Sequence, residues 1–466
     1  MIRRSLKAAG LTALLLTMTG AAAAAPGIDA ERRAAATELL RQSDQVVEQI
    51  QQLRGVRATR SITREVESRA TLRSTIAELA ARELTAAQVE STDRLLTFLG
   101  VLTPGQDYLQ LSLDLLEEQI AGFYDEESQT FRILDDMPAA MQPAIMAHEL
   151  FHAIQDQVWD LDRVRSFGDI VTDVGTARTA LIEGDALAVM LMYQSGGEVD
   201  LTRSAVISKA LGASTKRPES GVAATVSEPL WQSLVAPYTV GMRFVTTVAR
   251  ERQWSGVDAV YLDPPRSSEQ VLHPERYLDR DEPTWLTYRT GMPTDARYIV
   301  DVLGEFMGRE VLANLLRGRV SHASVERGMA GWDGDRLEGW RLEDGRERVT
   351  WLLVWDSVDD AESFARVASM LAIDWVGADP DHRAGAWGGS AEAASDSAAL
   401  RVERWGDLVA VVLEKGDGAA AAVRRDELAA VTGAMLCSAV RRSYPPESAG
   451  WDAEGSGVGV AVGPAR

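Results

Sequence analysis

The chain has 466 residues, of which 46% are hydrophobic and 25% are charged; this is the composition of a folded globular protein and excludes a disordered or fibrous one. Lys and Arg number 48 against 69 Asp and Glu, giving a net charge of −21, which argues against a nucleic-acid partner because binding phosphates needs clustered positive charge. Cys437 is the only cysteine, so an intrachain disulfide and a multi-thiolate metal site are both excluded.

The first 25 residues have the layout of a secretory signal peptide. Three basic residues within the first seven precede an apolar stretch at 8–18, and a run of small residues ends at Ala25. Eleven apolar residues are too few to span a bilayer as a helix, and no other uncharged apolar run is long enough. We therefore expect a secreted or periplasmic protein with no membrane span after signal cleavage; an uncleaved membrane anchor is the alternative.

Residues 26–119 show a mainly helical pattern, in which Ala, Leu, Arg and Glu dominate and Gly and Pro are few. Two short β-prone runs follow at 122–125 and 130–134, separated by polar residues typical of a hairpin. We expect these runs to open a second domain. The strand at 130–134 can also pair with an extended peptide if it lies at an exposed sheet edge; otherwise it belongs to the core.

A predicted helix over 139–159 carries the most informative motif, His148-Glu149-Leu150-Phe151-His152. Residues four apart on a helix share one face, so both imidazoles can reach the same metal ion. Glu149 projects beside them, where it can accept a proton from a water that the metal activates. The chain has only five histidines, so chance is a poor explanation of this spacing. The alternative is a helix face with two hydrogen-bonded histidines and no metal.

Catalytic zinc usually takes three protein ligands and leaves a fourth position to water, so a third ligand is needed. A second predicted helix, 176–193, is made almost wholly of apolar residues, yet Glu183 lies on its apolar face. An ionised carboxylate there is costly without a partner, and a metal ion held by two imidazoles supplies one. Asp185 is the competing candidate. Because it points elsewhere on the helix, we expect Asp185 to orient a ligand histidine, a role that Asp156 or Gln155 can also fill.

Beyond residue 300 the pattern changes to strands and helices in the order β, β, α, β, β, α, which predicts a small α+β domain. Asp344-Gly345 and Gly406-Asp407 are suited to hairpin turns. The expected strands are 336–341, 349–355, 400–405 and 408–414, and the expected helices are 359–373 and 420–440. Segment 377–398, rich in Gly, Ala, Ser and Asp, is expected to be a loop, and residues 444–466 a disordered tail.

Seven of the twelve tryptophans lie between residues 321 and 410. Aromatic side chains at this density can form a ligand platform, but they more often fill a core and pair across hairpins. We therefore expect them to be core residues of the C-terminal domain.

These motifs resemble a known enzyme family. The motif at 148–152, followed on a later helix by Glu183-Gly184-Asp185-Ala186, is similar to the gluzincins, the thermolysin-like superfamily of zinc metallopeptidases. A set of secreted bacterial proteins of that type is resembled more closely, from about Leu53 to Tyr277, on the segments Ala121-Gly-Phe-Tyr-Asp125, His152-Ala-Ile-Gln-Asp-Gln157 and Ser268-Glu-Gln-Val-Leu-His-Pro-Glu275. The resemblance implies that His148, His152 and Glu183 are zinc ligands and that Glu149 is the general base.

The implied activity is hydrolysis of peptide bonds in a peptide or protein substrate by a zinc-activated water. The oxyanion formed needs a hydrogen-bond donor, for which Tyr238 and His273 are candidates; the alternative for each is a buried packing residue. A rival of a different class is a non-catalytic zinc-binding protein of the cell envelope, a degenerate peptidase that acts as a binding module. Structural zinc is normally closed by four protein ligands, whereas catalytic zinc keeps one position open.

The predicted fold is α+β, with a mainly helical, zinc-peptidase-like catalytic domain that contains a small sheet, and a C-terminal α+β accessory domain. The expected divisions are a signal peptide (1–25), a helical N-terminal region (26–119), a gluzincin-like metallopeptidase domain (120–300), the accessory domain (301–443) and the tail (444–466).

Overall fold

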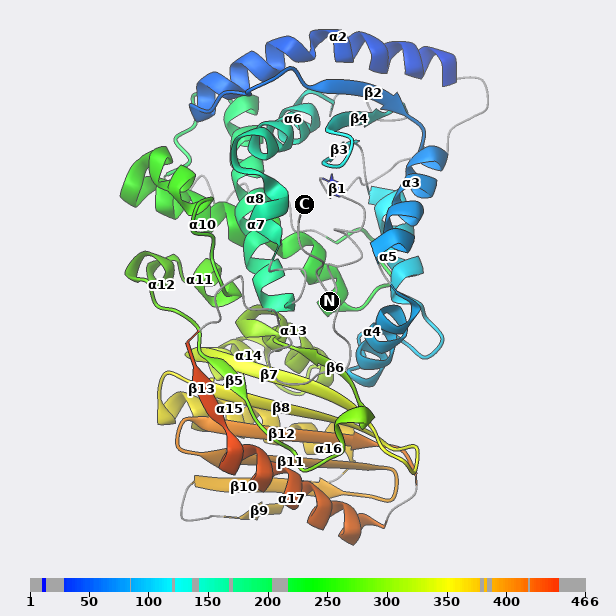
Figure 1. Ribbon diagram of the computed structural model, residues 1–466, viewed down its shortest axis with the longest axis vertical. Helices are drawn as coiled ribbons and strands as arrows, with labels where there is room; N and C mark the ends of the chain where they lie inside the picture. Colours follow the sequence, from blue (N-terminus) through cyan, green and yellow to red (C-terminus); the bar gives the residue numbers. More distant parts are fainter. Residues whose placement is uncertain are drawn as a thin grey trace. The chain divides into compact units, whose positions relative to one another are not determined.

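The computed structural model describes residues 11–13, 29–83, 85–119, 122–135, 142–166, 171–202, 217–377, 381–383, 388–417 and 420–443. The chain divides into two compact units, Met1–Asp281 and Glu282–Arg466. Helices and strands occur in both, so the fold is α+β, as the sequence predicts (Figure 1). The division precedes the boundary expected at residue 300, because strand β6 (Arg297–Asp301) pairs with strand β7 (Trp332–Arg341) of the second unit.

The first unit is mainly helical. Its helices are α2 (Asp29–Arg54), α3 (Arg69–Glu83), α4 (Ala86–Phe98), α5 (Tyr108–Gln119), α6 (Gln142–Trp159), α7 (Leu161–Arg165), α8 (Thr172–Gln194), α10 (Glu228–Val260), α11 (Ser268–Leu272) and α12 (Pro274–Asp279). Helix α8 is buried along almost its whole length and packs against α10, α6 and α2. The prediction of a buried helix over 176–193 is therefore confirmed, and the helix begins four residues earlier, at Thr172.

A small sheet accompanies these helices. Its strands lie in the order β1 (Leu11–Ala13), β3 (Gly122–Asp125), β4 (Thr130–Leu134) and β2 (Thr63–Glu67). The predicted hairpin is confirmed, because β3 and β4 pair antiparallel. Strand β4 also pairs with β2 in parallel, so the idea that residues 130–134 offer an exposed edge is wrong. The outer neighbour of β3 is β1, which falls within the predicted signal peptide.

Helices α8 and α10 approach each other through two glycines. A side chain on Gly184 of α8 would collide with the backbone of Gly241, and one on Gly241 would collide with the Ala180 carbonyl. The two helix backbones are therefore in direct contact at this point. The close approach fixes α10 beside the residue that precedes Gly184 on α8, which is Glu183.

The second unit is a sheet covered by helices. Its elements are β5 (Trp285–Thr287), η1 (Thr294–Ala296), β6, α13 (Gly304–Leu315), α14 (His322–Met329), β7, β8 (Glu347–Trp355), α15 (Val358–Ser369), α16 (Leu371–Trp375), β9 (Asp381–Arg383), β10 (Gly388–Ala394), β11 (Ala398–Trp405), β12 (Leu408–Lys415), α17 (Ala421–Ser438) and β13 (Val440–Arg442). Seven strands form the main sheet in the order β6-β7-β8-β12-β11-β10-β9, and β13 pairs separately with β5. Both predicted hairpins, β7–β8 and β11–β12, are confirmed.

The main sheet has a helix on each face. Leu352 and Val354 of β8 pack in one core with Leu428 and Met435 of α17. The ring of Trp351 on the same strand contacts α15. Because side chains alternate along a strand, α15 and α17 lie on opposite faces. Both faces are therefore apolar, as the sequence of β8 reflects.

The tryptophans of the second unit serve mainly as core. Four of the seven are buried, namely Trp332, Trp340, Trp351 and Trp355, which confirms the core interpretation for these four. Trp375 and Trp405 are half-buried, and Trp387 lies outside the described residues.

The prediction of a loop over 377–398 is partly wrong. Residues 388–394 form strand β10, which pairs with β11 along its length. Apart from Glu392, the strand consists of Gly, Ala and Ser, and it lacks the bulky β-branched side chains that mark a strand in a sequence. The predicted disordered tail, 444–466, lies outside the described residues.

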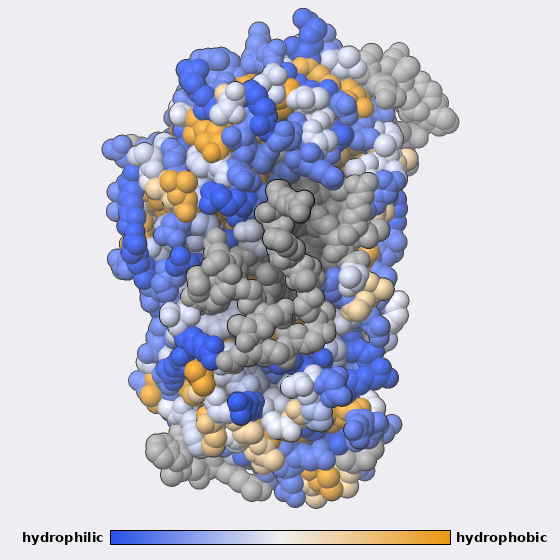
Figure 2. All heavy atoms as spheres, viewed as in Figure 1, coloured by the Kyte–Doolittle hydropathy of each residue, from blue (hydrophilic) through white to orange (hydrophobic). Residues whose placement is uncertain are grey.

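No helix within the described ranges has the length and apolar character that crossing a bilayer requires. The described side chains visible in Figure 2 are mostly hydrophilic, with hydrophobic ones in small separate patches.

Candidate metal centre

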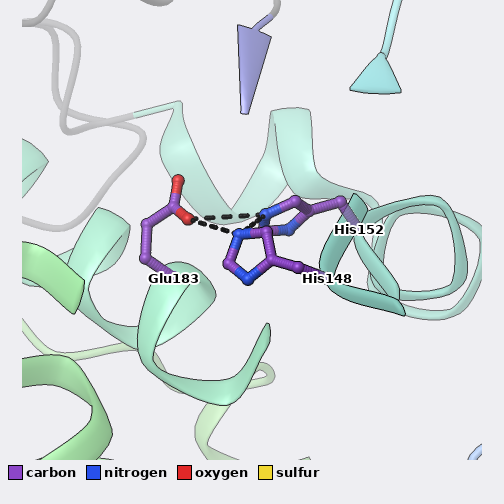
Figure 3. Close-up of side chains that lie close together, drawn as sticks. All are labelled: His148, His152 and Glu183. Carbon is purple, nitrogen blue, oxygen red and sulfur yellow. Dashed lines mark hydrogen bonds and ion pairs between the residues drawn. The ribbon is translucent and has the colours of Figure 1, made fainter. Parts of the chain in front are cut away.

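Three predicted ligands meet in the first unit. Helix α6 presents His148 and His152 one turn apart, and the adjacent helix α8 presents Glu183 toward them (Figure 3). The two Nε2 atoms are 2.9 Å apart, and Glu183 Oε2 lies 3.3 Å from His148 Nε2 and 3.4 Å from His152 Nε2. All three side chains are buried. The structure thus brings together residues that are 31 positions apart in the chain.

The charges of this cluster follow from its burial. Burial, together with the neighbouring His152, lowers the pKa of His148 to about 4, so His148 is neutral near pH 7. Burial alone would raise the pKa of Glu183, but the imidazoles of His152 and His148 outweigh it and lower the pKa to about 2. The cluster near pH 7 therefore contains a carboxylate anion, and His148 does not supply a cation for it.

A metal ion fits this arrangement. Within the described part of the chain, Glu183 Oε2 and His148 Nδ1 are buried polar atoms for which no hydrogen-bond partner is found. Among the described residues, no Lys or Arg pairs with Glu183, whose ion-pair partners are the two imidazoles. Imidazole nitrogen and carboxylate oxygen are common ligands of divalent transition metals. His148, His152 and Glu183 can therefore hold a metal ion; without one, the two Nε2 atoms are close enough to share a proton.

Glu149 lies beside the ligands but is anchored to the sheet. Its side chain is fully buried, and its Oε2 accepts a hydrogen bond from the backbone N–H of Tyr124 at 3.2 Å. Tyr124 belongs to β3, so the outer strand of the hairpin runs next to this carboxylate. Glu149 is not a member of the three-residue ligand cluster.

The two oxyanion candidates are placed differently. Tyr238 on α10 is buried, and its ring centroid lies 6.0 Å from that of His148. Gly241 follows Tyr238 by about one helical turn, so the close contact of α10 with α8 holds Tyr238 at the cluster. His273 lies between α11 and α12, its side chain is 39% exposed, and its Nδ1 is 4.0 Å from Glu275. The ring contact therefore favours Tyr238.

Three side chains were candidates for orienting a ligand histidine. Gln155 is the one in direct contact, since its Oε1 lies 2.7 Å from His152 Nδ1. Asp156 instead accepts a hydrogen bond from the hydroxyl of Tyr124 at 2.8 Å. Asp185 is fully buried and forms an ion pair with Arg54 at 2.8 Å. Among the described contacts, Asp185 is not bonded directly to a ligand histidine.

Sequence reasoning missed three residues near the site: Tyr124, Arg54 and Tyr261. Arg54 meets Asp185 across 131 positions of the chain, and Tyr261 meets Gln155 across 106. No local spacing encodes such contacts. The one available signal was the acidic residue Asp185 on an apolar helix, which requires a buried partner without saying which.

The comparisons with known proteins match part of the second unit. A family model described as a domain of unknown function (DUF8575) matches residues 296–425, all of which lie in the second unit. No curated protein and no solved structure matches the chain. The case for the site therefore rests on its geometry and chemistry.

Proposed function

We propose that this protein is a secreted, zinc-dependent metallopeptidase. The observation that carries the proposal is the buried convergence of His148, His152 and Glu183, with Glu149 next to His148 in the sequence of α6. Three protein ligands are the number that catalytic zinc takes when one position stays open for water. The chain also begins with the pattern of a secretory signal.

The chemistry of the site follows from its side chains. When bound, zinc polarises a carbonyl group and lowers the pKa of water toward 7. Glu149, held by the Tyr124 amide, takes the proton of the attacking water and returns it to the leaving amine. Tyr238, whose ring lies against that of His148, donates its hydroxyl proton in a hydrogen bond to the developing oxyanion.

We expect an extended substrate to bind at the small sheet of the first unit. Strand β3 runs beside Glu149, and its outer side is the side on which β1 pairs. Since β1 belongs to the predicted signal peptide, cleavage of that peptide frees the outer edge of β3. A peptide that adds there as a strand lies next to the general base.

The rival function is a non-catalytic zinc-binding protein of the cell envelope. The observation that favours it is burial, because His148 and His152 have no exposed surface and Glu183 has 4%, whereas a peptidase site must admit its substrate. A structural zinc site is normally closed by a fourth protein ligand. The number of ligands in the loaded protein therefore separates the two functions.

The proposal is tested by comparing the mature chain, from residue 26, with its Glu149→Gln variant. Both are expected to carry about one zinc per chain, since Glu149 is not a ligand. Hydrolysis of a mixed peptide library should fall by on the order of 10² or more in Glu149→Gln, and stay unchanged in Glu251→Gln, an exposed acid on α10. Equal hydrolysis in native and Glu149→Gln protein, or zinc without any hydrolysis, would contradict the proposal.

A further inference from the structure

A continuous chain of buried hydrogen bonds leads away from the ligand His152. Gln155 Oε1 lies 2.7 Å from His152 Nδ1, and Gln155 Nε2 lies 2.6 Å from the hydroxyl of Tyr261. That hydroxyl lies 3.0 Å from Asp185 Oδ2. Asp185 is bound in turn by Arg54, whose Nε is 2.8 Å from Oδ1 and whose Nη2 is 3.1 Å from Oδ2.

In this series of hydrogen bonds, the groups that can only accept determine which atom donates in each bond. Gln155 Nε2 also lies 3.0 Å from the carbonyl oxygen of Ile182, so the amide nitrogen must face that carbonyl and Oε1 must face His152. An amide oxygen only accepts, so His152 Nδ1 carries the proton. At the other end the Asp185 carboxylate accepts, so the hydroxyl of Tyr261 donates to it and accepts from Gln155.

The same bonds tie together the helices that carry the ligands. Ile182 directly precedes the ligand Glu183 on α8, while Gln155 follows His152 by three positions on α6. One side chain therefore couples a histidine ligand to the backbone next to the carboxylate ligand.

The far end of the chain is held rigidly. Arg54 is the last residue of α2 and is almost fully buried. Its guanidinium lies 4.7 Å from the ring centre of Trp254 and 5.9 Å from that of Trp159. Trp159 stacks on Tyr261, with ring centroids 4.0 Å apart and planes at 6°. An arginine that contacts two aromatic rings and binds a carboxylate through two nitrogens keeps little conformational freedom.

We propose that this chain of hydrogen bonds sets the tautomer of His152, so that the proton stays on Nδ1 and Nε2 presents its lone pair to the metal. The positioning residues are Gln155, Tyr261, Asp185 and Arg54. Because Arg54 is the last residue of α2, the N-terminal helix contributes one of these positioning residues. The inference rests on metal binding by the cluster, which is part of the proposed function, and needs no peptidase activity.

The direct test is the tautomer of His152 in the metal-free, full-length mature chain. With ¹⁵N-labelled histidine, imidazole nitrogen chemical shifts show which nitrogen of His152 is protonated. The native chain is expected to show the Nδ1–H form. Gln155→Leu, which removes the acceptor, should lose that preference. Gln157→Leu is the matched control, because Gln157 is on the same helix but binds the backbone of residues 59 and 60.

A second readout is zinc affinity, measured by competition with a chelator. Partners of a metal-bound histidine contribute about 10- to 100-fold to affinity, so Gln155→Leu should weaken zinc binding within that range. Tyr261→Phe keeps the stacked ring and loses only the hydroxyl, so it should fold and weaken binding by a smaller factor. Arg54→Met should behave similarly. Cobalt-substituted Gln155→Leu should also show a shifted visible absorption spectrum.

The outcomes separate this inference from the proposed function. A native chain that shows the Nδ1–H form and binds zinc but hydrolyses no peptide would overturn the proposed function and leave the positioning role of these residues standing. Native protein with Nε2–H, or Gln155→Leu and Tyr261→Phe with native tautomer and zinc affinity, would overturn the inference. If Arg54→Met fails to fold, Tyr261→Phe decides the matter.

Discussion

In the second unit, the buried carboxylate of Glu414 is surrounded by permanent cations, whereas in the first unit the buried carboxylate of Glu183 faces imidazoles. Glu414 has no exposed surface and accepts hydrogen bonds from Arg346 at 3.0 Å, from Arg348 at 2.9 Å and from Arg424. Its charge is compensated within the fold. No external ion is needed there, which fits a structural role for this network.

In the first unit, no Lys or Arg among the described residues compensates the charge of Glu183. The partners of Glu183 are two imidazoles, and His148 is neutral near pH 7 because burial lowers its pKa. Burying an ionised carboxylate costs free energy unless an opposite charge compensates it, and the two units provide this compensation in different ways. In the second unit, arginines of the same unit neutralise the buried acid. In the first unit, three potential metal ligands converge, and a bound divalent cation can neutralise the carboxylate. The contrast between the units can be tested from both sides.

The largest effect on stability is expected in the second unit. Glu414→Gln leaves three buried arginines without their shared carboxylate, and should lower the free energy of unfolding by about 3–5 kcal/mol. Chemical denaturation measures this. Metal binding by the first unit should be unaffected, and a loss of zinc in Glu414→Gln would show that the two networks are not independent.

The corresponding change in the first unit should act on metal binding instead. Glu183→Gln removes a ligand, so zinc affinity should fall by at least about 10², more than the loss of an outer partner causes. The unfolding free energy of the metal-free protein should fall by only about 1 kcal/mol, since neutral hydrogen-bonding partners remain. Calorimetric zinc titration and denaturation provide the two numbers. A larger loss of metal-free stability than in Glu414→Gln would reverse the comparison.

A Gly→Ala substitution should change the free energy of unfolding in opposite directions in a helix of each unit. Gly241→Ala places a methyl group into the backbone of α8 and should destabilise the protein by about 1–3 kcal/mol through overpacking. In α17, a Cβ at Gly433 meets no atom within 4 Å, so Gly433→Ala should stabilise by about 0.5–1 kcal/mol. The melting temperatures of both variants test the close approach of α8 and α10, the helices that carry Glu183 and Tyr238.

The two units should also respond oppositely to mild acid. Burial lowers the pKa of His148 from 6.5 to about 4, so the stability that it contributes is present above pH 6.5 and is lost as pH falls toward 4. Burial raises the pKa of Asp335 from 3.8 to about 6, so its contribution is present below pH 3.8 and is lost as pH rises through 6.

Denaturation of metal-free protein at pH 7 and pH 5 checks this. Removing the titrating group in His148→Gln should reduce the loss of stability on acidification, while Asp335→Asn should increase it. Changes of the same sign in both variants would contradict the assigned shifts.

The part of the metal centre that could be predicted from the sequence is the part with a local spacing. His148 and His152 are one helical turn apart, and Glu149 follows from the same turn. Glu183 was predicted because an acid on an apolar helix face needs a partner. The turn dipeptides likewise predicted the β7–β8 and β11–β12 hairpins.

The remainder depends on tertiary contacts. The bond from Gln155 to Tyr261 and the ion pair from Arg54 to Asp185 join distant segments, and nothing near any of them in the sequence marks the partner. Strand β10 was missed because small residues carry no strand signal, and its neighbour β11 determines its conformation. The division at Asp281 was missed because β6 pairs with β7 further along the chain.

The central claim is that two imidazoles and one carboxylate hold a single zinc ion with one position left open. X-ray absorption at the zinc edge of the loaded mature protein tests it most directly, since it counts imidazole ligands and measures their distances. We expect two imidazole nitrogens at about 2.0–2.1 Å, with oxygen ligands completing four-coordination. Protein that takes up no zinc, or zinc bound by three or more imidazoles, would contradict the account.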